Sequence, residues 1–248
     1  MIQDRLKIAK AGRGPDVLLS RQTMLNCGAF EGNGAGCDGG DPIDVFKYMV
    51  KFGLPDNTCL SYSATDHTRF NKTGDVKHCP PLAICENCMP LPPNGTETCW
   101  AVKTPILYKL NSWHKIQNGS HGQEVAMMNE IYQKGPIVCS ISTPEDFTYG
   151  YRAGIWPDEK TKFDDIDHNV EVVGWGEEDG TPFWVIRNSW GSFWGELGFF
   201  RLQRSVNSFW LENGDCWAAE PEFKMEQACG ELQNKTNMEL RKKTYKRR

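Results

Sequence analysis

The stretch that decides the fold reads DHNVEVVGWG over residues 167–176, and RNSWG follows it over residues 187–191. His168 stands directly before an apolar run, and Asn188 follows a second apolar run further along the chain. Each run is typical of a strand, so the two side chains can meet if the strands pair. Most single histidines and asparagines only end strands or fill turns, which is the plain alternative. Two motifs in this order and at this spacing favour a catalytic pair.

A histidine oriented by an asparagine can act as a general acid–base group beside a thiol nucleophile. A thiolate attacks the substrate carbonyl, and a neighbouring imidazolium lowers the pKa of that thiol. The same ring then protonates the leaving amine. A carboxamide behind the ring accepts a hydrogen bond that fixes its orientation and tautomer. His168 is therefore predicted as the acid–base group and Asn188 as the group that orients it.

Further motifs extend the pattern towards the N-terminus. They are LLSRQ at 18–22, CG at 27–28, GCDGG at 36–40 and GPI at 135–137. Together with the two motifs above, they resemble the papain-like cysteine peptidases over about residues 1–220. Within that family the chain is similar to the cathepsin X subfamily, also called cathepsin Z, because of AKAG at 9–12 and the cysteine-dense stretch 59–99.

The resemblance implies an α+β, papain-like fold of two lobes. Residues 1–110 would form an incomplete helical left lobe with a disulfide-rich insert over 59–103. Residues 111–222 would form a β-rich, barrel-like right lobe that carries His168 and Asn188. The substrate cleft would run between the lobes, and the basic segment 223–248 is expected to be disordered.

The resemblance also assigns supporting roles. Trp190 would cover the His–Asn hydrogen bond, and Asp167 would face the substrate. Gly39 and Gly40 would present bare backbone to an extended substrate, since a Cβ there would block strand-like pairing. The alternative for the glycines is a tight turn that needs a positive φ.

The nucleophile is the missing member. The family carries it in a Cys-Gly-Ser-Cys-Trp segment, and this chain has no such segment. Cys27 lies 141 residues before His168, inside the usual gap of about 130–150. Local sequence overrules that spacing, because Cys27 follows the Leu-Ser-x-Gln pattern, where the family has a disulfide cysteine. We therefore expect the nucleophile upstream of Met1, and the chain as written to be inactive.

Ten cysteines are many for a cytosolic enzyme. The resemblance implies the pairs Cys27–Cys79, Cys59–Cys85, Cys88–Cys99 and Cys139–Cys216. In this scheme Cys37 and Cys229 have no partner. The cysteine that pairs with the equivalent of Cys37 in the family lies in the segment that this chain lacks. Four of the cysteines, between positions 79 and 99, could instead hold tetrahedral zinc. Irregular spacing and a single Cys-x2-Cys pair favour disulfides, so neither a metal nor another cofactor is expected.

Four glycosylation sequons, at Asn71, Asn94, Asn118 and Asn234, agree with the cysteines in favouring a lysosomal, vacuolar or extracellular protein. No signal peptide is visible near Met1, and no run is long enough to span a membrane. The chain carries a net charge of −4, although residues 224–248 contain eight basic and three acidic residues. Without interleaved aromatic residues, this basic segment does not predict nucleic-acid binding. The expected partner is a peptide or protein substrate, and the expected state is a monomer.

Three functions follow from these observations. The first is a cysteine-type peptidase, of carboxypeptidase type by resemblance, although the subfamily's insertion before the nucleophile is also absent. The second is a non-catalytic secreted binding or scaffold protein, since a fold does not dictate a function. The third is a disulfide-stapled structural fragment. Upstream coding sequence that encodes Cys-Gly-Ser-Cys-Trp would separate the first from the others.

Periodicity predicts few regular elements. We expect Ile2, Leu6 and Ala9 on the exposed end of a helix. A second helix should run from Pro42 to Gly53, and a third should cover residues 123–133. The expected strands are 137–142, 169–173, 183–186 and 198–202. The core-facing residues of the second helix are predicted to be Ile43, Phe46, Met49 and Val50, and those of the third Val125, Met128 and Ile131.

Overall fold

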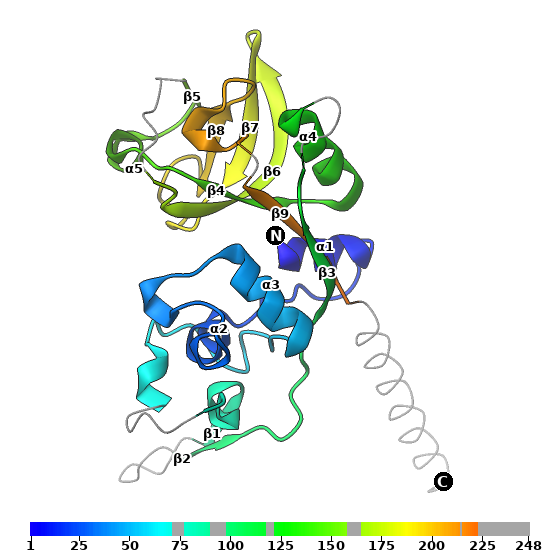
Figure 1. Cartoon of the computed structure of the whole chain (residues 1–248), viewed down its shortest axis with the longest axis vertical. Coiled ribbons are helices and arrows are strands. Elements are labelled where there is room, and N and C mark those ends of the chain that lie inside the picture. Colours follow the sequence, from blue (N-terminus) through cyan, green and yellow to red (C-terminus); the bar gives the residue numbers. More distant parts are fainter. Residues whose placement is uncertain (71–76, 90–97, 118–121, 158–164, 214, 223–248) are drawn as a thin grey trace, which may run out of the picture.

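The computed structural model describes residues 1–70, 77–89, 98–117, 122–157, 165–213 and 215–222. They form two lobes, one above the other in Figure 1. The upper lobe contains a large sheet with α4 (Gln123–Lys134) and α5 (Glu145–Gly150). The lower lobe contains α2 (Arg21–Cys27), α3 (Pro42–Lys51) and the hairpin β1 (Glu86–Met89) and β2 (Thr98–Ala101). The chain's N-terminus and α1 (Ile2–Ala9) lie between them.

The large sheet has seven strands in the order β3-β9-β4-β6-β7-β8-β5. Neighbouring strands are antiparallel except β5 and β8, which are parallel. The central strands are the four that the sequence predicts, with β6 extending further than expected. The strands are β3 (Leu110–Lys115), β4 (Ile137–Ile141), β5 (Ile155–Trp156), β6 (His168–Glu178), β7 (Thr181–Arg187), β8 (Phe199–Gln203) and β9 (Cys216–Pro221).

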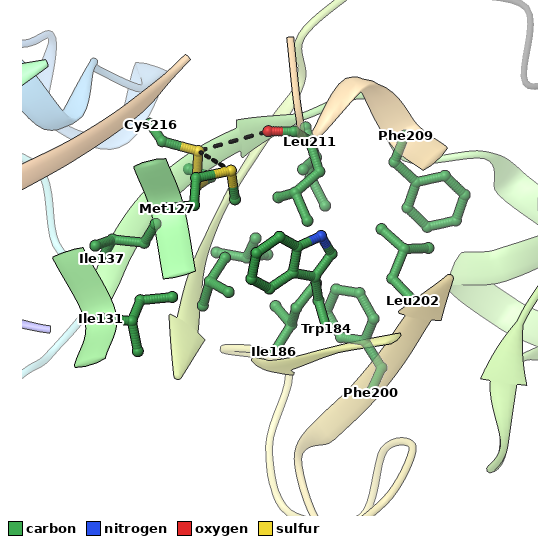
Figure 2. Close-up of a cluster of buried hydrophobic side chains, with 14 of the residues drawn as sticks. Met127, Ile131, Ile137, Trp184, Ile186, Phe200, Leu202, Phe209, Leu211 and Cys216 are labelled. Atoms are coloured by element: carbon green, nitrogen blue, oxygen red, sulfur yellow. Dashed lines mark hydrogen bonds between the residues drawn. A yellow bond between two sulfur atoms is a disulfide. The ribbon is translucent and has the colours of Figure 1, made fainter. Parts of the chain in front are cut away.

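The core of the upper lobe is aromatic. Trp184 on β7 is fully buried among aliphatic side chains from the sheet and from α4 (Figure 2). Phe147 on α5 is also fully buried, and its ring lies within 5.3 Å of five other aromatic rings, measured between centroids. Edge-to-face contacts of this kind add stability beyond the burial of apolar area. The short helix α5 is therefore fixed against the sheet.

The lower lobe has a smaller core, built around Phe46 and Met49 of α3 and Cys27 of α2. Ser20 caps the start of α2, and Asp41 with Asp44 forms a capping box at the start of α3. The disulfide-rich insert over residues 59–103 contains the hairpin β1–β2 as well as two 3₁₀ turns, η3 (His67–Phe70) and η4 (Pro81–Ala83). Three further 3₁₀ turns are η1 (Ala29–Glu31), η2 (Gly36–Asp38) and, in the upper lobe, η5 (Ser208–Trp210).

Helix α1 differs from its prediction as an exposed end. Leu6 is 2% exposed and Arg5 is 3% exposed, because the helix packs between the lobes and contacts β9. Arg5 donates hydrogen bonds to the carbonyl oxygens of Pro136 (2.7 Å), Gly135 (3.0 Å) and Ala219 (3.3 Å), and to the carboxylate of Glu130 (3.0 Å). A buried guanidinium needs such partners.

The predicted faces of the two longer helices are partly wrong. On α3 the buried residues are Phe46, Tyr48 and Met49, while Val50 is 40% exposed. On α4 they are Gln123, Met127 and Ile131, with Val125 and Met128 only partly buried. The amide of Gln123 donates to the carbonyl of Ile116 at 3.0 Å. The buried face of α4 therefore begins with a polar residue, which an apolar periodicity does not predict.

Several predictions lie outside the described residues, namely the four sequons, Cys229 and the basic segment 223–248. Among the described residues, no helix has the length and apolar character needed to cross a membrane.

Candidate active site

The two predicted residues meet because the strands that carry them pair. His168 is the first residue of β6, and Asn188 directly follows the last residue of β7. Near this end of the antiparallel pair, Glu171 lies opposite Arg187. The result is a contact of 2.9 Å between His168 Nε2 and Asn188 Oδ1.

The second hydrogen bond to Asn188 Oδ1 sets the tautomer of the ring. The backbone N–H of Ser189 donates to the same oxygen at 2.8 Å, which requires the carboxamide oxygen to face the imidazole. Nε2 must then be the donor, and Nδ1 is the ring atom with a free lone pair in the neutral form. Within the described residues Nδ1 has no hydrogen-bond partner, so it can exchange a proton with a reacting group.

Trp190 covers this contact. Its ring stacks on the His168 ring with centroids 4.9 Å apart and an interplanar angle of 22°. Trp194 supports it from the side at 4.9 Å, and Phe147 lies 6.5 Å away. Asn188 itself is 9% exposed, so water has little access to the hydrogen bond.

The loop that holds Trp190 is anchored at several points. The N–H of Asn188 donates to the carbonyl of Gly198 at 2.9 Å, closing the loop at its base. Glu196 accepts a two-pronged ion pair from Arg201, whose Nε and Nη2 lie 3.0 and 2.9 Å from its two oxygens, and a hydrogen bond of 2.8 Å from the N–H of Gly154. Burial acts to raise the pKa of Glu196, but these hydrogen bonds and the charge of Arg201 outweigh it and leave the pKa below its ordinary value.

Another carboxylate on β6, Glu171, is bound to α1. Glu171 contacts the Met1 amino group at 2.7 Å and the guanidinium of Arg187 at 3.4 Å. Burial raises the pKa of Glu171. Because Glu171 follows His168 by three residues on the strand, its side chain points to the opposite face of the sheet.

A cavity of about 720 Å³ lies between the lobes and reaches the edge of the site. The upper lobe contributes Val138, Asn169 and Ser189, and the lower lobe contributes both predicted glycines, Gly39 and Gly40. Gly39 adopts a φ of 107°, which favours glycine, although a Cβ there would meet nothing within 4 Å. The positive φ of the turn is thus one reason why glycine occupies position 39. The absence of a side chain beside the cavity is a second feature of this position, and the two do not conflict.

Asp167 is exposed and has a structural contact. Its Oδ1 accepts the N–H of Thr143 at 3.0 Å, and its own N–H donates to Ile141 at 3.1 Å. These bonds hold the chain that leads from β4 towards α5 beside His168.

Sequence analysis did not predict two residues that line the cavity, Asn169 and Ser189. Asn169 on β6 is the register partner of Ser140 on β4, and the hydroxyl of Ser140 donates to Asn169 Oδ1 at 2.9 Å. Ser189 orients the Asn188 carboxamide through its backbone N–H. The pairing of a serine with an asparagine across two strands depends on register, which no motif in the sequence specifies.

The cysteines form the four pairs that the resemblance implies: Cys27–Cys79, Cys59–Cys85, Cys88–Cys99 and Cys139–Cys216. The zinc alternative is therefore wrong for this structure, because all four of its candidate sulfurs are in disulfide bonds. Spacing had also nominated Cys27 as a nucleophile, but it is buried and cross-linked. Cys37 is the free cysteine of the described residues, and it is exposed.

Comparison with known proteins agrees with this geometry. Residues 1–221 match the papain family of cysteine proteases. The chain belongs to this family. A family member from Onchocerca volvulus named Cathepsin Z is 35% identical over 206 residues, covering 82% of this chain and 58% of the relative. Cathepsin B-like cysteine proteinase 1 of Ostertagia ostertagi is 31% identical over 218 residues, covering 85% of this chain and 60% of the relative.

Solved structures show the same papain-like α+β fold. Digestive procathepsin L 3 from Tenebrio molitor larval midgut superposes with a TM-score of 0.65 at 23% identity, covering 88% of this chain and 60% of that one. Procathepsin B S9 from Trypanosoma congolense gives a TM-score of 0.64 at 24% identity, covering 89% of this chain and 65% of that one. The chain spans about 60% of the length of the two curated relatives.

Proposed function

We propose that this chain carries the catalytic histidine of a cysteine peptidase, His168, and the asparagine that orients it, Asn188, and that residues preceding Met1 supply the thiol. The observation that carries the proposal is the 2.9 Å contact of His168 Nε2 with Asn188 Oδ1 beneath the Trp190 ring. Membership of the papain family supports it. A non-catalytic protein would have no chemical need for an imidazole oriented in this way.

The geometry suits a sequence of proton transfers. A thiol beside Nδ1 transfers its proton to the ring, and the thiolate attacks the substrate carbonyl. The imidazolium then protonates the leaving amine, and the acyl group stays on sulfur. Water hydrolyses this thioester with His168 acting as the base. Throughout, Asn188 Oδ1 accepts a hydrogen bond from the Nε2–H of His168 and keeps Nδ1 directed at the reacting atoms.

The cavity provides a route by which the thiol can reach His168. Met1 and the first two residues of α1, Ile2 and Gln3, line it together with Met24, Phe46 and Met49 of the lower lobe. A helical continuation of α1 beyond Met1 would enter this space, which also borders Ser189. We propose that such a segment carries the nucleophile, and that the cysteine three residues before the nucleophile pairs with the exposed Cys37.

The finer assignments are also proposals. Identity of 35% to a Cathepsin Z supports a peptidase of that type, acting mainly as a carboxypeptidase on peptides or proteins. Four disulfides support a lysosomal or extracellular location, because such bonds persist in oxidising compartments. No cofactor is needed for this chemistry, and the protein is proposed to act as a monomer.

The test is a protein extended by the upstream coding sequence. If that sequence encodes Cys-Gly-Ser-Cys-Trp, the extended protein should hydrolyse peptides in a thiol-dependent reaction. His168→Ala should abolish turnover, since loss of a triad histidine lowers kcat by about 10⁶ in a serine peptidase series, and Asn188→Ala should reduce it less. His78→Ala is the matched control, because His78 is 83% exposed in the lower lobe.

The result that would overturn the proposal is an extended protein that folds, has a titratable thiol and does not cleave any peptide. An upstream codon for serine or glycine in place of the nucleophile would do the same. A non-catalytic binding protein on the papain-like fold would then be the better description. The chain as printed is expected to be inactive on its own.

A further inference from the structure

The segment between β8 and β9 contains a strained loop. Ser205, Asn207, Phe209 and Trp210 all have a positive φ, between 54° and 72°. A positive φ is uncommon outside glycine, and for bulky residues such as Phe209 and Trp210 it is unfavourable. Strain of this kind persists only where the surrounding structure fixes the backbone. We refer to residues 205–212 as the clamp loop.

The carboxylate of Glu212 fixes the clamp loop. Its Oε1 accepts the backbone N–H of Ser205 at 2.8 Å, and its Oε2 accepts the backbone N–H of Asn207 at 2.9 Å. In return, Asn207 Oδ1 accepts the backbone N–H of Glu212 at 2.9 Å. These three hydrogen bonds join the start of the loop to its end.

Glu212 also binds the strand that leads to Asn188. Its Oε1 accepts the indole N–H of Trp184 at 2.8 Å. Trp184 lies on β7 and is fully buried, so its N–H needs an acceptor inside the protein. In Figure 2 the indole nitrogen lies on the side of the ring towards Leu211, the residue before Glu212. Because Asn188 directly follows β7, this hydrogen bond fixes the strand close to the carboxamide that contacts His168.

A second connection runs through aromatic rings. Phe209 of the clamp loop is fully buried, and its ring centroid lies 4.8 Å from that of Phe147. The Phe147 ring lies 6.5 Å from that of Trp190, which stacks on His168 at 4.9 Å. Protein interiors are close-packed, so a shift of Phe209 displaces the rings behind it. The clamp loop is therefore connected to both partners of the imidazole, to Asn188 through β7 and to Trp190 through Phe147.

Another carboxylate contacts the same loop in a different way. Glu124 on α4 accepts the side-chain hydroxyl of Ser205 at 2.7 Å and pairs with the guanidinium of Arg204. Both contacts are made to side chains, whereas those of Glu212 to the loop are made to backbone N–H groups. Glu124 thus contacts the clamp loop without holding its backbone.

We propose that Glu212 is a positioning residue for the catalytic histidine. By holding the clamp loop and Trp184, it keeps the Asn188 carboxamide and the Trp190 ring against His168. This inference rests on the proposed function, since it takes His168 as the acid–base group of a peptidase. Glu212 acts only through the side chains and backbone that it holds, and has no part in the chemical step.

The positioning can be measured by NMR in the printed chain, without a nucleophile. Glu212→Gln keeps the shape of the side chain but replaces one acceptor oxygen with a donor, so a backbone or indole N–H loses its partner. The Nε2–H of His168, which Asn188 accepts at 2.9 Å, should then exchange with solvent about twofold to thirtyfold faster, the range of couplings through packed side chains. The ring-current shift that Trp190 imposes on the imidazole protons should fall in the same variant.

Two control variants separate positioning from a general loss of stability. Glu124→Gln removes the carboxylate that contacts the clamp loop through side chains. Ile131→Val lowers the stability of the same core from α4. Well below the unfolding temperature, neither control should change the exchange rate or the ring-current shift of His168. A change in either control as large as that in Glu212→Gln would refute the positioning role.

A milder pair of variants keeps the proposal testable if Glu212→Gln does not fold. Asn207→Ala removes the carboxamide that binds Glu212 and places at a φ of 56° a residue that disfavours it. Asn207→Gly removes the same carboxamide but tolerates the positive φ. The alanine variant should accelerate the exchange of the His168 Nε2–H more than the glycine variant. Exchange at the original rate in both variants would overturn the proposal.

The extended protein separates this inference from the proposed function. There Glu212→Gln should lower kcat about twofold to thirtyfold and leave KM unchanged, because the histidine is misplaced while substrate contacts are intact. If the extended protein cleaves peptides and Glu212→Gln has the original kcat, the positioning role fails and the peptidase stands. If it never cleaves, yet the His168 signals respond to Glu212→Gln, the peptidase fails and the positioning of the histidine stands.

Discussion

The two lobes achieve their stability in different ways. Among the described residues, the upper core contains eighteen buried residues with one disulfide. The lower core contains nine, of which Leu110 and Ala219 come from the edge strands β3 and β9, and three disulfides lie in the lower lobe. A small core cannot offset the conformational entropy of a long looped insert, so covalent cross-links replace apolar burial there. The comparison teaches that the His–Asn pair stands on the lobe with the larger core, and the glycines beside the cavity stand on the cross-linked one.

The largest expected effect is on the upper core. Phe147→Ala should lower the free energy of unfolding by about 3–5 kcal/mol, because it removes a fully buried aromatic ring and leaves a cavity. Urea unfolding followed by tryptophan fluorescence measures this. Tyr149→Ala, in the same helix at 73% exposure, should change stability by less than about 0.5 kcal/mol. Equal effects would mean that the upper core does not depend on its aromatic cluster.

A somewhat smaller effect is expected on the lower lobe. Replacing both Cys27 and Cys79 with alanine opens a cross-link that spans 52 residues, and should cost about 2–4 kcal/mol. Removing Cys88–Cys99, which spans 11 residues, should cost less because the loop is shorter. Hydrogen exchange should show lost protection in α2 and α3 while β6 and β7 keep theirs. Equal loss in both lobes would show that they unfold as one unit.

A third prediction concerns pH and the upper lobe. The pKa of Glu196 is below its ordinary value of 4.5, since hydrogen bonds from Arg201 and Gly154 outweigh the effect of burial. Its contribution to stability is therefore present above pH 4.5 and disappears as the pH falls through the folded-state pKa. Glu196→Gln should flatten the fall in melting temperature below pH 4.5. The exposed Glu145→Gln should leave the curve unchanged, and the same flattening in that control would argue against the assignment.

The smallest effect tests the face of α3. Val50→Ser should change the free energy of unfolding by less than about 0.5 kcal/mol, because the side chain is 40% exposed. Met49→Ala, one position earlier and fully buried, should cost about 2–5 kcal/mol. Thermal unfolding of the two variants measures this difference in stability. A larger loss of stability in Val50→Ser than in Met49→Ala would support the buried face that the periodicity predicts, with Val50 in the core.

Sequence reasoning works best where a motif joins chemistry to a strand. His168 and Asn188 were predicted, and so were the strands that bring them together, because apolar runs on both sides leave few alternatives. It fails where packing decides. Val125 and Met128 were assigned to the inward face of α4, whereas the structure buries Gln123 and Met127 there. The short strands β3 and β9 have no distinct pattern. The Ser140–Asn169 pair depends on register, which local sequence does not reveal.

The buried Arg5 has a consequence for which lobe α1 moves with. Its guanidinium joins α1 to carbonyl groups just before β4 and on β9, and to a carboxylate on α4. Pulling α1 away from these elements would break several of these bonds at once and leave a cation without partners in a dry interior, which is strongly unfavourable. Helix α1 is therefore fixed to the upper lobe, although the chain continues from it into α2 of the lower lobe.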